Sequence, residues 1–134
     1  MKKRFFLLVI PFLILHACGN DDDASIDNPD LLGKWRLIEQ LVDPGDGSGT
    51  FQPISSDQEL EFLEEGVLNV TNGDICSLAI DSDGENTVSY SLDESTITAD
   101  CENFIGISFE IKEGRLFLYY SCIEGCAQKY QKLP

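Results

Sequence analysis

The stretch "FIGISFEIKEGRLFLYYS", from Phe104 to Ser121, decides the fold of this chain. In its first half, apolar residues alternate with small or charged ones as far as Ile111. This period of two is typical of a β-strand with one buried face. "KEG", Lys112 to Gly114, then supplies a glycine that can adopt the left-handed conformation of a tight turn, and a second apolar run follows. The stretch therefore predicts an antiparallel hairpin with strands at 104–111 and 115–122.

Similar signals run along the rest of the chain from residue 33 onward. "EEG" (Glu64 to Gly66) and "IEG" (Ile123 to Gly125) repeat the glycine turn, and each turn favours a three-residue loop that ends in the left-handed region. No segment shows a helical stripe of apolar residues. Eight or nine short strands are expected, at 33–43, 58–63, 67–71, 75–80, 87–92, 95–101, 104–111, 115–122 and 126–133. We predict an all-β fold, an antiparallel up-and-down barrel, because closure removes the sheet edges that favour aggregation.

The first 17 residues have the layout of a secretory signal peptide. Three basic residues, Lys2 to Arg4, precede an apolar run of 11 residues, Phe5 to Leu15, and the small residue Ala17 follows. A transmembrane helix needs roughly 20 apolar residues, so this run is too short to span a bilayer. We expect residues 1–17 to be removed.

The next feature is the sequence "LHAC", Leu15 to Cys18, which resembles the lipobox of bacterial lipoproteins. In that family the cysteine thiol receives a diacylglycerol, cleavage occurs just before it, and the new amino terminus is acylated. The resemblance implies that Cys18 is the first mature residue and the lipid anchor, because several acyl chains on one residue hold a protein durably on a membrane. In the alternative, the signal is simply removed and Cys18 is a free or paired thiol.

Residues 18–30 are predicted to be an acidic tether. "GNDDDASIDNPD", Gly19 to Asp30, carries five aspartates and one large apolar residue, so it cannot bury enough surface to fold. A flexible segment of this length reaches about 20 Å. Acidic residues after the lipidated cysteine also resemble the export signal of surface lipoproteins in Bacteroidota, which implies an outer-membrane location facing the cell exterior. A merely soluble linker is the alternative.

The charge balance excludes some partners. The chain has 24 Asp and Glu against 9 Lys and Arg, and loss of the signal leaves six bases, a net charge of −18. Such a chain repels phosphates, and no basic patch suited to nucleic acid is visible in the sequence. Attraction to an anionic membrane is not expected either. The lipid on Cys18 must therefore provide the membrane attachment.

Residues 31–134 suffice for one domain with its own core. "LLGKWRLIE", Leu31 to Glu39, places Gly33 and Trp35 on the first strand, a glycine-rich loop follows, and "KYQKL" ends the chain. Together with the glycine hairpins, this resembles the small lipocalin-like domains of Bacteroidota lipoproteins. The resemblance implies a barrel whose base is closed by Trp35, with Lys129 and Lys132 as candidates for the basic residue that covers the tryptophan.

Four cysteines remain after Cys18 and can pair in three ways. Cys122 and Cys126 flank the "IEG" turn and would face each other across a hairpin, close enough for a disulfide. This leaves Cys76 to pair with Cys101. A four-thiolate zinc site is the alternative, but the chain has no C-x-x-C pair. We expect two disulfides and no metal.

The sequence does not favour catalysis. His16 leaves with the signal, so the mature chain lacks histidine and cannot form a histidine-dependent triad or a Cys–His dyad. The many acids allow carboxylate pairs of the kind found in glycosidases, but nothing marks one pair. "DSDGEN", Asp81 to Asn86, is interpreted as a hairpin turn, because it lacks the distal glutamate of a calcium loop. We predict a non-catalytic domain without a cofactor.

Two functional classes stay open. In the first, the barrel is packed and its loops meet another protein or a glycan, as a monomeric interaction or accessory module. In the second, the barrel carries a small apolar or amphipathic ligand, and the long loop Asp43–Asp57 is either its lid or a plain connector. The residues that would line such a cavity, and otherwise form the core, are Trp35, Phe51, Phe62, Tyr90, Phe109, Leu118 and Tyr120. The first class is favoured because 104 residues leave little volume to hollow out.

Overall fold

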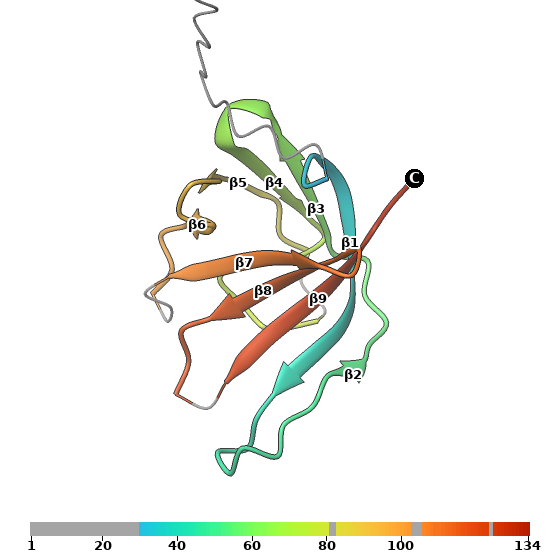
Figure 1. Ribbon diagram of the computed structural model, residues 1–134, viewed down its shortest axis with the longest axis vertical. Coiled ribbons are helices and arrows are strands. Elements are labelled where there is room, and N and C mark those ends of the chain that lie inside the picture. Colours follow the sequence, from blue (N-terminus) through green and yellow to red (C-terminus); the bar gives the residue numbers. More distant parts are fainter. Residues whose placement is uncertain (1–29, 81–82, 103–105, 124) are drawn as a thin grey trace, which may run out of the picture.

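The computed structural model describes residues 30–80, 83–102, 106–123 and 125–134 (Figure 1). The signal peptide, Cys18 and most of the tether lie outside the described residues. The strands are β1 (Gly33–Val42), β2 (Gln52–Pro53), β3 (Glu59–Leu63), β4 (Val67–Thr71), β5 (Asn86–Ser91), β6 (Thr96–Thr98), β7 (Ile107–Lys112), β8 (Arg115–Tyr120) and β9 (Cys126–Lys132), with one 3₁₀ turn, η1 (Glu64–Gly66). Across the described part of the chain, no helix has the length and apolar character needed to cross a bilayer.

The sheet closes on itself. Its strand order is β2-β1-β3-β4-β5-β6-β7-β8-β9, every pairing is antiparallel, and β1 also pairs with β9. Eight strands, β1 and β3 to β9, therefore form a closed up-and-down barrel, and β2 is an extra strand beside β1, as Figure 1 shows. The long β1 allows this, since one of its edges pairs with β3 at Gly33–Arg36 and with β2 at Glu39–Gln40. The predicted all-β, lipocalin-like barrel is confirmed.

The "KEG" turn of the hairpin between β7 and β8 is tighter than predicted. Lys112 pairs with Arg115, so the loop contains only Glu113 and Gly114, with φ angles of 53° and 71°. Two-residue loops with both residues in the left-handed region match the right-handed twist of the flanking strands. The three-residue connection predicted for "EEG" is present as η1, between the paired ends of β3 and β4.

The strand predicted at 75–80 was wrong. The Asp74 carboxylate accepts a hydrogen bond from the Cys76 amide at 2.9 Å, and the Asp74 carbonyl accepts one from the Ser77 amide at 3.0 Å, so the chain turns here. Ile75 is 0% exposed and Leu78 packs against the core. The apolar residues in this segment fill one end of the barrel, and we call residues 73–78 the plug. These residues are apolar because they are buried, and in the sequence their spacing resembles that of a strand.

The tryptophan at the other end is held as the family resemblance implied. The indole Nε1 of Trp35 donates to the Leu31 carbonyl at 2.8 Å. Lys132 Nζ lies 5.3 Å from the centre of the indole ring and donates to the Asp30 carbonyl at 2.6 Å. Lys132 is therefore the base that covers Trp35, and the other candidate, Lys129, lies over the Phe51 ring instead.

Candidate functional site

The barrel interior contains the core residues predicted from the sequence. Each of the following is buried and belongs to one hydrophobic cluster: Trp35, Phe62, Tyr90, Phe109, Leu118 and Tyr120. The ring of Phe62 lies 5.0 Å from that of Tyr90 and 5.8 Å from that of Phe109, at angles typical of edge-on packing. We call the part of the interior around Trp35 and these three rings the apolar half.

A cluster of hydrogen-bonded side chains occupies the other half of the interior. Gln128 lies at its centre, where its Oε1 accepts from the hydroxyls of Tyr120 and Tyr130, each at 2.7 Å. Its Nε2 donates to Gln40 Oε1 at 3.2 Å, and Gln58 Nε2 donates to the Tyr130 hydroxyl at 3.1 Å. Gln58 and Gln128 are both 0% exposed. We call this region the polar half.

Burial fixes the protonation of the two tyrosines. It raises the pKa of Tyr120 and Tyr130 well above that of a free tyrosine, because the phenolate would lose its hydration. Both hydroxyls therefore stay protonated near neutral pH and can donate to Gln128 Oε1.

The plug covers the polar half. Gln40 Nε2 donates to the Leu78 carbonyl at 3.0 Å, and the Cys76–Cys101 disulfide fastens the same segment to the residues that follow β6. Gly73 packs so closely on Gln58 that an added Cβ would lie 2.5 Å from the amide side chain, so no larger residue fits there. The disulfide prediction is confirmed here and for Cys122–Cys126.

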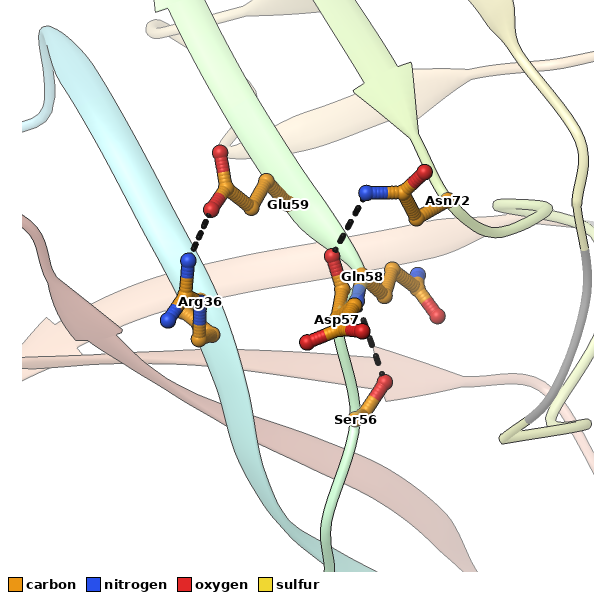
Figure 2. A network of polar contacts seen from close by, with 6 residues as sticks. All are labelled: Arg36, Ser56, Asp57, Gln58, Glu59 and Asn72. Carbon is orange, nitrogen blue, oxygen red and sulfur yellow. Dashed lines mark hydrogen bonds and ion pairs between the residues drawn. The ribbon is translucent and has the colours of Figure 1, made fainter.

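Local contacts direct Gln58 inward. Its backbone amide donates to Ser56 Oγ at 3.1 Å, and Asn72 Nδ2 donates to the Asp57 carbonyl at 3.2 Å. Figure 2 shows the Gln58 side chain on the opposite side of its strand from the ion pair of Arg36 with Glu59. Once inside, Gln58 Oε1 is buried and has no hydrogen-bond partner among the described residues.

Sequence reasoning missed this polar half. Glutamine is mostly exposed in proteins, so Gln40, Gln58 and Gln128 were not counted among interior residues. The last strand did contain a signal, because Gln128 and Tyr130 are two residues apart and alternate with Lys129 between them. This alternation places Gln128 and Tyr130 on the same face of the strand. Only closure of the barrel brings Gln40 and Gln58 next to them.

The first loop folds around a single side chain. The Asp43 carboxylate accepts four hydrogen bonds, at 2.7–3.1 Å, so the loop folds around this side chain. The donors are the backbone amides of Gly45, Asp46, Gly47 and Gly49. These bonds, with that of Gly49 the strongest, lower the pKa of Asp43.

The end of the same loop follows the outside of the barrel. The Phe51 ring lies 5.6 Å from that of Phe117, and Lys129 Nζ lies 4.5 Å from its centre. Phe117 alternates with the inward-facing Leu116 and Leu118, so Phe51 rests on the outer face of β8 and β9. The expectation that Phe51 lines an interior cavity therefore does not fit its position.

Cavities lie at two of the loops. One of about 410 Å³ is lined by Asp43, Gly45, Gly47, Ile123 and Gly125. The other, of about 510 Å³, is lined by Asp74, Cys76, Ser77, Asn86, Asp100 and Glu102. None of the inward-facing aromatic residues lines either cavity. Within the described ranges, no three His, Cys, Asp or Glu side chains come together as a metal site would require.

The fold and the filled interior define a class, the small closed antiparallel barrel of lipocalin-like form. Comparison of the chain with family models, with curated proteins and with solved structures found no match. The resemblance to the lipoproteins of Bacteroidota therefore stays a prediction from the sequence.

Proposed function

We propose that the mature chain is a lipid-anchored protein of the outer membrane, facing the cell exterior, whose barrel is a non-catalytic interaction or accessory module. The lipobox at Leu15–Cys18 and the acidic tether support the anchor and the location. In this proposal the loops meet another protein or a glycan, and the barrel holds these loops in place.

One observation carries the choice of an interaction module over a carrier, namely that the interior side chains bond to each other. Gln128 satisfies two tyrosine hydroxyls, and the apolar half is filled by rings in mutual contact. A guest inside the barrel would have to displace these contacts, and each buried group left unpaired costs about 1–3 kcal/mol. Recognition by the loops carries no such cost.

A carrier of a small apolar or amphipathic ligand is the second candidate. Its support is Gln58 Oε1, a buried acceptor without a partner among the described residues. A guest with a hydroxyl or amide donor would satisfy that atom if the plug moved aside. This candidate therefore requires both an opening and a repacking of the apolar half.

Fluorescence distinguishes the two candidates, because Trp35 is the chain's single tryptophan and lies at the base of the interior. An interaction module should show no saturable change in Trp35 emission when a long-chain fatty acid is added at micromolar concentration. Quenching that saturates at one ligand per chain, and that competes with a second apolar probe, would instead make the protein a carrier.

The anchor is tested separately with Cys18→Ala. The wild-type chain should enter the detergent phase on phase separation, and the variant should stay in the aqueous phase or remain unprocessed. Proteolysis of intact cells then tests the outward orientation, since a surface protein is cleaved without lysis. Equal partitioning of variant and wild type would remove the anchor from the proposal.

A further inference from the structure

The cations of the domain are gathered on one side of the barrel. After residue 30 the chain has six Lys and Arg residues, and all lie on β1, β7, β8 and β9, which are neighbours in the closed sheet. They are Lys34, Arg36, Lys112, Arg115, Lys129 and Lys132. Lys34 and Arg36 alternate with the buried Trp35 and Leu37, and Arg115 alternates with the buried Leu116, so these cations point outward. We call the outer surface of these four strands the basic face.

Carboxylates are fewer than cations on these four strands and the β7–β8 turn, which contain Glu39, Glu110 and Glu113 against six Lys and Arg residues. At the plug end of the barrel, the described segments 43–58, 72–80, 83–85 and 99–102 contain eight Asp and Glu residues but no Lys or Arg. Ten residues of β1 separate this end from Gly33, a length of about 30 Å. Charges exposed to solvent are screened over about 8–10 Å at physiological salt. The acidic loops therefore do not cancel the field close to the basic face. Carboxylates nearer to it do so in part, since Arg36 is paired with Glu59, Lys129 with Glu39, and Lys34 lies opposite Glu61.

Exposed aromatic groups adjoin the cations on the same side. The rings of Phe117 and Tyr119 lie parallel on the outer surface of β8, with centres 6.3 Å apart, and Tyr119 is 39% exposed. Cations beside exposed aromatic side chains are typical of surfaces that lie at a membrane interface.

The chain also enters the domain at this side. Asp30 lies against β9, where its carbonyl accepts from Lys132 Nζ at 2.6 Å. Twelve residues, 18–29, separate it from the predicted lipid, and a fully extended chain of that length spans at most about 40 Å. The lipid therefore keeps the basic face within reach of the headgroups.

We propose that the basic face lies against the membrane that holds the lipid on Cys18, with Lys34, Lys112 and Arg115 contacting the anionic phosphate groups of lipid headgroups. The charge complementarity of these cations and the entry point of the tether carry the proposal, which rests on the lipid anchor of the proposed function. In this orientation the acidic plug end, with its 510 Å³ cavity, stays outside the membrane contact and accessible to a partner.

The test compares the lipidated mature protein on two vesicles, one of pure phosphatidylcholine and one with a third of the lipid replaced by phosphatidylglycerol. Flotation first shows whether the protein is anchored to both. Acetylation of Lys34 and Lys112, followed by peptide mass spectrometry, should then be about 5-fold slower on the anionic vesicles, and 0.5 M NaCl should abolish the difference.

Two variants with the same change of charge sharpen the result. Lys112→Gln/Arg115→Gln should lose the protection of Lys34, whereas Ala79→Glu/Ser89→Glu, which alters exposed positions away from the basic face, should keep it. Equal acetylation on both vesicles, with the protein still floating, would overturn the orientation and leave the anchor intact. Failure to float would overturn the anchor itself. Protection on intact cells but not on vesicles would assign the face to another anionic macromolecule and contradict this proposal.

Discussion

The two halves of the barrel interior are filled by different chemistry, although the same sheet encloses both. In the apolar half, Phe62, Tyr90 and Phe109 pack ring against ring around the base that Trp35 closes. Burial of apolar area is nondirectional, so this half depends on volume. In the polar half, Gln128 must meet two hydroxyls in the correct direction, so that half depends on geometry.

The difference explains why a plug and a disulfide lie at one end only. An apolar end excludes water by its own packing, whereas a buried amide cluster is stable only while water is kept from competing for its bonds. Ile75 and Leu78 provide that cover, and Cys76–Cys101 keeps them in place. We therefore expect the two halves to respond differently to substitution.

The largest expected effect is in the apolar half. Phe109→Ala removes a ring that contacts Phe62 and Tyr90, and the cavity left behind should lower the free energy of unfolding by about 3–5 kcal/mol. Chemical denaturation measures the loss. Phe51→Ala is the matched control, because Phe51 rests on the outer face and should lose much less. Equal losses would mean that the apolar half is not close-packed.

Removal of the plug disulfide should come next. The Cys76–Cys101 disulfide links residues that are 25 apart in the sequence, so Cys76→Ala/Cys101→Ala should lower the free energy of unfolding by about 3.5 kcal/mol on the chain-entropy estimate. The Cys122–Cys126 disulfide links residues only 4 apart, so Cys122→Ala/Cys126→Ala should lower it by about 2 kcal/mol. Hydrogen exchange should rise at the amides of residues 73–78 in the first variant and not in the second. Equal destabilisation, with no change of exchange in the plug, would count against its role as a cover.

The polar half provides a matched pair of substitutions. Gln128→Met removes the Oε1 atom that accepts from the hydroxyls of Tyr120 and Tyr130, and it should cost about 2–4 kcal/mol. Gln58→Met removes an amide whose Oε1 already lacks a partner among the described residues, so about 1 kcal/mol or less is expected. Both glutamines are fully buried, so the contrast in denaturation midpoints reports hydrogen bonding. A larger loss for Gln58 would contradict the assigned network.

The smallest effect concerns the first loop and its pH dependence. Four amide bonds lower the pKa of Asp43 in the folded state, so their contribution is fully present above about pH 3.9, the unfolded value. It is lost as the pH falls through the lower folded value. The Gly49 amide proton, followed by NMR, should titrate with a midpoint below 3.9, and Asp43→Ala should abolish that titration. A midpoint at or above 3.9 would show that the loop does not fold around Asp43.

The sequence could predict those parts of the fold that depend on neighbouring residues. Alternation and the glycine of "KEG" were enough for the hairpin of β7 and β8. The position of Cys122 and Cys126 around the "IEG" turn was enough for their disulfide, although β8 ends at Tyr120, which pairs with Cys126, and Cys122 lies in the loop. The plug was misread because Ile75 and Leu78 are buried across the end of the barrel, and burial there produces the same apolar spacing as a strand.

Features that need the closed barrel could not be predicted in this way. The sequence left Lys129 and Lys132 as equal candidates to cover Trp35, and only the pairing of β9 with β1 distinguishes them. The same closure brings Gln58 to Tyr130 across a separation of 72 residues. Phe51 could not be placed either, since a glycine-rich loop leaves its direction open.

Xenon binding under pressure reports whether the barrel interior is packed. Xenon enters dry apolar cavities, such as those created by deletion of a large side chain. In a crystal structure of the pressurised protein, no xenon should lie between Trp35 and Phe109 in the wild type, whereas a site should appear there in Phe109→Ala. Xenon bound inside the wild-type barrel, among Phe62, Tyr90 and Phe109, would contradict the packed interior and favour a ligand carrier.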